Sequence, residues 1–471
     1  MDVTAPALRR PENSRAERAA AGKAARAAVP LRAHAELELA PDRDVVGLLL
    51  GQATSRVPEL VPVRHGRMLA SPFTFFRGAA LPMAADLASS PDSGLRVQLC
   101  GDAHLANFGA FASPERRLVF DLNDFDETLP GPFEWDVKRL GASFEVAGRD
   151  NGFSDKQRRA IVLAAARGYR EAMRDFAQMP TLDVWYAGTD LEEALQQARS
   201  KLKKGRYEAS EALLTKARKR DSTQALGKLT TVVDGRRRIV SDPPLVVPVE
   251  ELFDHLAADA INQEIRSLVD SYGRSLQPNR RHLLHQFTVT QLARKVVGVG
   301  SVGTRAWILL LEADGGEEHL FLQAKEAQES VLAAYAGRSR FANHGQRVVV
   351  GQQLMQAVSD IFLGWQRTTG VDGVERAYYV RQLRDWKFSA PIDQMVPSGM
   401  QVYADLCART LARAHARSGD RIAIAAYLGS SEKFDNAIAD FAVAYADLTE
   451  RDHAALAAAV DEGRAAARFD V

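Results

Sequence analysis

Two side chains that could act on a hydroxyl group stand five residues apart within residues 101–107. Asp102 supplies a carboxylate that can accept a proton, and Asn107 supplies a neutral oxygen that can bind Mg²⁺ without adding negative charge. His104, between them, either orients Asp102 or packs beneath the loop. Because the apolar run LRVQLC comes directly before, we expect a strand that ends at this loop.

A second group of carboxylates follows a β-rich run at Leu118 to Leu122 and includes Asp124 and Asp126. The interval between Asn107 and Asp124 has room for one β-hairpin, so the two side chains are expected to meet over one metal ion. Asp126 is a third candidate metal ligand. An Asp-rich turn is often only a solvated loop or a helix cap, but the strand-loop-strand context favours the metal site.

A glycine-rich stretch, with Gly298, Gly300, Ser301 and Gly303, comes much later in the chain. The apolar run WILLL after it predicts a strand, whereas a dinucleotide-binding motif would open a helix. The pattern therefore indicates a glycine turn between two strands, whose backbone N–H groups can approach phosphate oxygens.

Lys325 ends the next predicted strand, LFLQAK. Its ammonium group is a candidate ligand of the α- and β-phosphates of a nucleotide, and the simpler alternative is an edge-strand lysine. A helix is expected over residues 326–336, and Glu329, one turn into it, is the favoured acidic partner of Lys325.

The amino-acid composition argues against several classes of function. The chain has 61 basic and 60 acidic residues, a net charge of +1, which argues against general binding to nucleic acid or to a membrane surface. No apolar run is long enough to span a membrane, and the N-terminus lacks the apolar core of a secretory signal. With only two cysteines, we expect a cytoplasmic protein.

Changes in composition and hydrophobic pattern along the sequence divide the chain into four segments. Residues 1–40 form a polar arm, either a basic helix or, as favoured, disordered. Residues 41–280 form the half with the candidate catalytic loop and include a basic helical insertion near 199–238. Residues 281–395 form the half with the glycine turn. Residues 396–471 form Ala-rich helices that are expected to pack on the first half. The expected fold is α+β, with a helix-rich lobe and a small antiparallel sheet.

Several segments together resemble the bacterial DUF2252 family: LCGDAHLANFG, VFDLNDFDETLPGPFEWDVKRL, GVGSVGTRAW and LFLQAKEA. The resemblance runs from about residue 30 to the C-terminus. The name of this family implies no reaction.

More distantly, the chain resembles kinase-like phosphotransferases of the aminoglycoside and choline kinase type. Asp102 and Asn107 have the spacing of the kinase catalytic loop, and residues 124–126 are similar to its metal-binding element. The resemblance implies ATP and Mg²⁺ as cofactors, a small-molecule acceptor, and Asp136 as a support of the catalytic loop. Kinases carry the glycine turn and lysine before the catalytic loop, so a circularly permuted two-lobed kinase fold is expected.

Three alternatives remain open: an adenylyl transferase, a nucleotide-binding regulator without catalysis, and a metal-dependent phosphoesterase. The phosphoesterase would need further His, Asn and Asp clusters, which the sequence lacks. Nothing in the sequence indicates an oligomeric state. The nucleotide hypotheses require Lys325 and Asp124 to face each other across a cleft.

Overall fold

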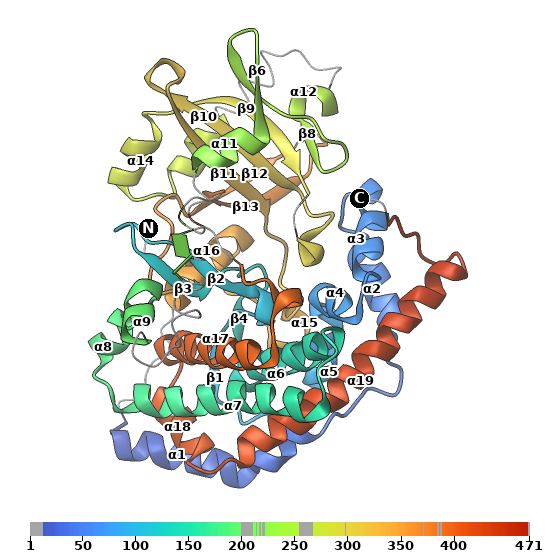
Figure 1. Cartoon of the computed structure of the whole chain (residues 1–471), viewed down its shortest axis with the longest axis vertical. Coiled ribbons are helices and arrows are strands. Elements are labelled where there is room, and N and C mark those ends of the chain that lie inside the picture. The colour runs from blue at the N-terminus through green and yellow to red at the C-terminus, as the bar shows by residue number, and fades with distance from the viewer. Residues whose placement is uncertain are drawn as a thin grey trace.

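The structure is a computed structural model that describes residues 13–198, 211–212, 214–215, 218, 222–253, 267–296, 298–370, 372–383, 386 and 389–469. It has an α+β fold, in which a helical lower part carries an antiparallel sheet above it (Figure 1). The chain first forms most of the helical part, then the sheet, and returns to the helical part with its last three helices. Part of the basic insertion expected near 199–238 lies outside the described residues.

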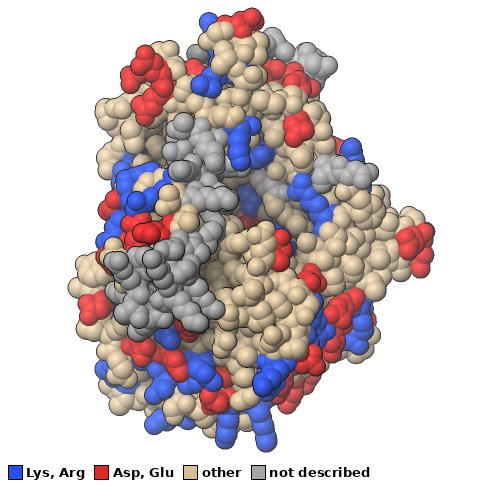
Figure 2. All heavy atoms as spheres, in the orientation of Figure 1, with Lys and Arg blue, Asp and Glu red and all other residues tan. Residues whose placement is uncertain are grey.

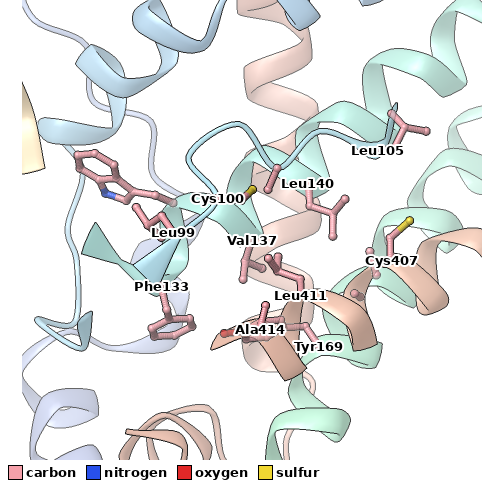
Figure 3. Close-up of a cluster of buried hydrophobic side chains, with 14 of the residues drawn as sticks. Leu99, Cys100, Leu105, Phe133, Val137, Leu140, Tyr169, Cys407, Leu411 and Ala414 are labelled. Carbon is pink, nitrogen blue, oxygen red and sulfur yellow. The ribbon is translucent and has the colours of Figure 1, made fainter. Parts of the chain in front are cut away.

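Long helices with one apolar face form the core of the helical part. The core helices are α6 (Phe133–Asp150), α7 (Asp155–Gln178), α17 (Pro397–Ser418) and α19 (Lys433–Asp461). Two further helices, α1 (Arg15–Ala28) and α18 (Arg421–Leu428), pack beside them. α17 packs along α7, and α19 packs on both α6 and α7. Phe133, Tyr169 and Leu411 belong to their shared core (Figure 3), as do the free thiols of Cys100 and Cys407.

The N-terminal arm differs from the disordered segment favoured for residues 1–40. From residue 15 onward it forms α1, which lies along α18. The arm has few large apolar residues, but Gly22 lets the two helix backbones approach closely, and the Arg18 guanidinium pairs with Asp420 at 2.6 Å. Close backbone contact and an ion pair therefore order a segment whose composition indicated disorder.

Shorter helices surround this core and the sheet. They are α2 (Val45–Ala53), α3 (Val61–Met68), α4 (Pro72–Gly78), α5 (Ala80–Ala88), α8 (Thr181–Tyr186), α9 (Leu191–Ala198), α11 (Ser222–Leu229), α12 (Val249–Leu252), α14 (Pro278–Leu284), α15 (Ala333–Ala336) and α16 (His344–Met355). Among the helices that the structure describes, none combines the length and the apolar composition that crossing a membrane would need.

Two small sheets lie within the helical part. β1 (Arg96–Leu99) pairs antiparallel with β4 (Leu129–Pro132). β2 (Phe108–Ala112) forms a hairpin with β3 (Leu118–Leu122), to which β5 (Thr189–Asp190) adds a short third strand. The loops that leave β1 and β3 are the two acidic segments singled out in the sequence.

The upper part contains a six-stranded antiparallel sheet in the order β12-β13-β11-β10-β9-β8. Its strands are β8 (Val246–Pro248), β9 (Thr288–Lys295), β10 (Ala306–Ala313), β11 (Glu318–Glu326), β12 (Gly364–Thr369) and β13 (Glu375–Gln382), and a separate hairpin is formed by β6 (Thr230–Val233) and β7 (Arg236–Ile239). Since β8 already pairs with β9, the sheet part begins well before the boundary expected at residue 280.

Gly22→Ala is expected to lower the free energy of unfolding. A Cβ at residue 22 would lie 2.0 Å from the Ala423 carbonyl oxygen, so α1 would have to move away from α18. Overpacking of this kind costs about 1–3 kcal/mol. Urea denaturation followed by circular dichroism measures the change.

Gly51→Ala is the matched control, because Gly51 also lies in a helix, α2, but a Cβ there meets no atom within 4 Å. This exchange should raise the free energy of unfolding by up to about 1 kcal/mol through helix propensity. Equal effects of the two substitutions would contradict the close packing of α1 on α18.

Candidate functional site

A buried carboxylate fixes the loop that carries Asp102 at the end of β1. The Asp136 side chain, in the first turn of α6, accepts hydrogen bonds from the backbone N–H of Cys100 at 2.8 Å and of Gly101 at 3.1 Å. Gly101 has a φ of +86°, and a Cβ there would lie 2.4 Å from the Glu127 carbonyl oxygen. Only glycine fits this turn, after which Asp102 is partly exposed while Ala103 and Leu105 return to the core.

Asp102 lies at the rim of the site with 19% of its side chain exposed. The Arg139 Nε, from α6, donates to Asp102 Oδ1 at 2.8 Å. Burial raises the pKa of Asp102, and Arg139 opposes that rise. His104 Nε2 lies 3.7 Å from Asp102 Oδ2, and burial holds the pKa of His104 well below its usual value, so the imidazole is neutral at pH 7. A carboxylate fixed in this way can orient a hydroxyl and accept its proton.

The β2–β3 hairpin brings Asn107 close to the residues around Asp124. Phe108 and Leu122 are paired across the hairpin, so the residues just before β2 and just after β3 are neighbours. The Asn123 N–H donates to the Asn107 carbonyl oxygen at 2.8 Å. The Asn107 side-chain N–H donates to the Asp102 carbonyl oxygen, also at 2.8 Å, which fixes its amide.

Lys325 reaches from β11 to the acidic loop that lies about 200 residues earlier in the chain. Its ammonium group donates to Asp126 Oδ2 and lies 3.6 Å from Asp124 Oδ2. Burial alone would lower the pKa of Lys325, but Asp124 and Asp126 outweigh it and raise that pKa above its usual value. The lysine therefore stays charged, and the ion pair joins the sheet to the acidic loop.

Asp126 differs from the metal ligand expected at this position. Its Oδ2 accepts from the Lys325 ammonium and from the Ser301 hydroxyl at 3.2 Å, and its Oδ1 accepts from the Tyr379 hydroxyl at 2.7 Å. Three donors take up most of the acceptor sites of its two oxygens, so in this structure Asp126 fixes Lys325 and has little capacity left for a cation. Asn107 and Asp124 remain the candidate metal ligands.

Glu329 is not the acidic partner that was expected for Lys325. The expected helix over residues 326–336 begins only at Ala333, because the chain before it is bonded to Glu127. The Ser330 hydroxyl donates to the Glu127 carbonyl oxygen at 2.8 Å, and the Val331 N–H donates to the Glu127 carboxylate at 2.7 Å. Glu329 is exposed on this extended segment, and the carboxylates beside Lys325 are Asp124 and Asp126.

The glycine-rich turn between β9 and β10 lies over the acidic loop. Its residues 299–301 form a single 3-10 turn, in which the Ser301 N–H donates to the Gly298 carbonyl oxygen at 2.9 Å. The Ser301 hydroxyl makes the contact with Asp126 described above. A side chain of the turn, and not only its backbone, therefore contacts the acidic loop.

Arg56, between α2 and α3, holds this turn in place. It is 6% exposed, and its guanidinium donates to the carbonyl oxygens of Gly300, at 3.0 Å, and of Val302. The neighbouring Val57 N–H donates to the Gly303 carbonyl oxygen at 2.8 Å. Burial lowers the pKa of Arg56 to about 10, so the guanidinium is still charged at pH 7.

Three side chains that complete the site were missed in the sequence: Arg56, Arg139 and Tyr379. The two arginines make contacts across the fold and have no local pattern around them. Tyr379 could have been found, because the run RAYYV has the composition of a strand, and in the structure Tyr379 lies opposite Lys325 in the pairing of β11 with β13.

A cavity of about 390 Å³ adjoins the acidic loop and is lined in part by Asp126, Gly300, Ser301 and Glu329. Figure 2 shows a surface hollowed between the sheet and the helical part, with basic side chains along the hollow. Within the described ranges, no group of three or more His, Cys, Asp or Glu residues could hold a metal ion. Asn107 and Asp124 carry the oxygen atoms that Mg²⁺ prefers as ligands, so they are the residues of this site that could hold such an ion.

The fold and the site together define an α+β protein. Its helical part carries an acidic loop, and its antiparallel sheet carries the lysine and the glycine turn that contact this loop. Residues 56–459 match the model of a family described as "uncharacterized protein conserved in bacteria (DUF2252)", so the chain belongs to the DUF2252 family. No curated protein and no solved structure matches the chain.

Arg56→Lys is expected to loosen the glycine-rich turn, because one ammonium cannot reproduce the fork that bonds two carbonyl oxygens. Amide hydrogen exchange in peptides that cover residues 298–304 should become about tenfold faster, while exchange in α6 and α7 stays unchanged.

Arg64→Lys serves as the control for this exchange experiment. Arg64 is fully buried nearby, but it donates to the Gly78 carbonyl oxygen at 2.8 Å and not to the turn. Exchange at residues 298–304 should stay as in the wild type. Equal acceleration in both variants would mean that Arg56 only stabilises the region in general.

Proposed function

We propose that this protein is a Mg²⁺- and ATP-dependent phosphotransferase that acts on a small-molecule acceptor. The observation that carries the proposal is the 3.6 Å distance between Lys325 Nζ and Asp124 Oδ2. It joins a cation suited to phosphate oxygens with a carboxylate suited to a metal ion. Phosphoryl transfer depends mainly on positioning and on charge stabilisation, which such a pairing supplies.

In this proposal, Lys325 binds the α- and β-phosphates and the turn at residues 298–303 covers them. Asn107 and Asp124 hold Mg²⁺, which neutralises phosphate charge when bound. Asp102 orients the acceptor hydroxyl and takes its proton. Burial raises the pKa of Asp102 and so makes it a stronger base, while Arg139 keeps it aimed.

We also infer a kinase-like, circularly permuted fold. In support, the helical part carries the carboxylates, and a small antiparallel sheet carries the glycine turn and the lysine. The sheet part follows the acidic loop in the chain instead of preceding it. The helical part is completed afterwards by α17, which packs along α7.

A thermal-shift titration with Mg²⁺ and ATP tests nucleotide binding. At about a hundred times its dissociation constant, a ligand adds roughly 2.7 kcal/mol to the stability of the folded state. The wild type should melt at a higher temperature with Mg-ATP than without it. Lys325→Ala should lose this ligand-induced rise, because the phosphates lose their cation.

Lys138→Ala is the control for that titration. Lys138 is also a buried lysine, 1% exposed, but its ammonium lies 4.5 Å from the centre of the Phe441 ring, among the helices. Each variant is compared with its own melting temperature without ligand, so a loss of stability does not mimic a loss of binding. A wild type that Mg-ATP does not stabilise would remove the proposal.

Asp102→Asn should retain the Mg-ATP shift and lose turnover, because the amide cannot accept the hydroxyl proton. General-base catalysis typically contributes about 10²–10⁴-fold to a rate. A screen of small hydroxyl compounds with coupled detection of ADP measures the loss. Unchanged turnover would exclude Asp102 as the base, and release of pyrophosphate instead of ADP would indicate adenylyl transfer.

A further inference from the structure

The sheet face that carries Lys325 is covered beyond that lysine by a separate segment of the chain. Side chains alternate along β11, so Phe321 and Gln323 share the face of Lys325. Phe321 packs in an apolar cluster with Leu229 and Ile239, which are 8% and 4% exposed. We call residues 222–240, which contain α11, β6 and β7, the cover segment.

Hydrogen bonds, in addition to apolar contacts, hold the cover segment on the sheet. The Ile239 N–H donates to the Gln291 side-chain oxygen, on β9, at 2.5 Å. The Val240 N–H donates to the Leu229 carbonyl oxygen at 2.8 Å, which ties the end of the hairpin to the end of α11. α11 also contacts β11, and Figure 1 shows it lying across the sheet.

A nucleotide with its phosphates at Lys325 can extend either along this face or into the cavity past the end of β11, which is lined in part by Glu326 and Glu329. Most residues that line that cavity are polar or charged, whereas a base favours an apolar surface, so the face of β11 is the better site for the base. Lys325 and Phe321 are separated by four residues, about 13 Å along a strand, which is comparable to the reach of ATP from its phosphates to its base. The apolar surface suited to a base there is formed by Phe321 and Ile308, and Leu229 and Ile239 already pack on it.

We propose that the cover segment is autoinhibitory, so that the base of ATP binds to the sheet only after α11 and β7 have moved away. This inference rests on the proposed function and adds a regulation of the same site. If only a fraction of molecules is uncovered, the apparent affinity for ATP equals the intrinsic affinity multiplied by that fraction. Weakening the cover therefore raises the affinity, whereas damage to a binding site lowers it.

The test compares Mg-ATP binding by isothermal titration calorimetry in the wild type, Ile239→Ser and Leu229→Ser. Each substitution removes an apolar contact that holds the cover closed, and the apparent affinity should rise about tenfold. Val232→Ser is the matched control, since Val232 lies in the same hairpin but is 60% exposed, and it should bind as the wild type does.

Mg²⁺ with tripolyphosphate is a second probe, because it has phosphates for Lys325 but no base to place under the cover. Its affinity should be the same in all four proteins. If the wild type binds ATP and both serine variants bind it equally or more weakly, the cover segment does not exclude the base and the inference fails. If no protein binds either probe, the proposed function fails instead. Circular dichroism verifies that each variant is folded, and either serine variant alone suffices for the comparison.

Discussion

The buried ion pair between Lys325 and the acidic loop is the contact on which the geometry of the site depends. The lysine side chain is 4% exposed, so its charge must be balanced within the protein. Asp126 balances it and is fixed in turn by the hydroxyls of Tyr379 and Ser301. Removing one partner of such a pair leaves an uncompensated charge, which typically costs about 3–5 kcal/mol. The sheet and the helical part are therefore held in one relative position at this point.

The acidic loop is also fixed from α16. Arg347, 2% exposed, donates to the carbonyl oxygens of Asp126 and Thr128, each at 2.7 Å, and of Gln328 at 2.9 Å. These bonds connect the acidic loop to the segment after β11, so the loop is bonded on two sides. Charged groups fixed in this way need no rearrangement when charge develops on a substrate, which is how preorganised sites stabilise a transition state.

The sequence could predict those site residues that are recognised from their neighbours in the chain. The runs at 95–100, 118–122 and 320–325 have the composition of strands, and Asp102, Asp124 and Lys325 each lie at or just after the end of one of them. That was enough to select Asp102, Asn107, Asp124 and Lys325. It was not enough to assign partners, because Glu329 is near Lys325 in sequence while Asp126 is near it in space. The docking of α1 and the entry of β8 into the sheet likewise depend on contacts with distant residues.

The same dependence on distant contacts holds for the loop that carries Asp102. The loop that carries Asp102 is supported from α17, where the Tyr403 hydroxyl donates to the Leu105 carbonyl oxygen at 2.9 Å and His415 Nε2 lies 3.2 Å from Asp136 Oδ2. These supports come from about 280–300 residues further along the chain. Within the helical part the loop requires α17, and between the two parts Lys325 of the sheet requires the acidic loop. The site thus depends on which surfaces meet and not on the order in which the chain forms them.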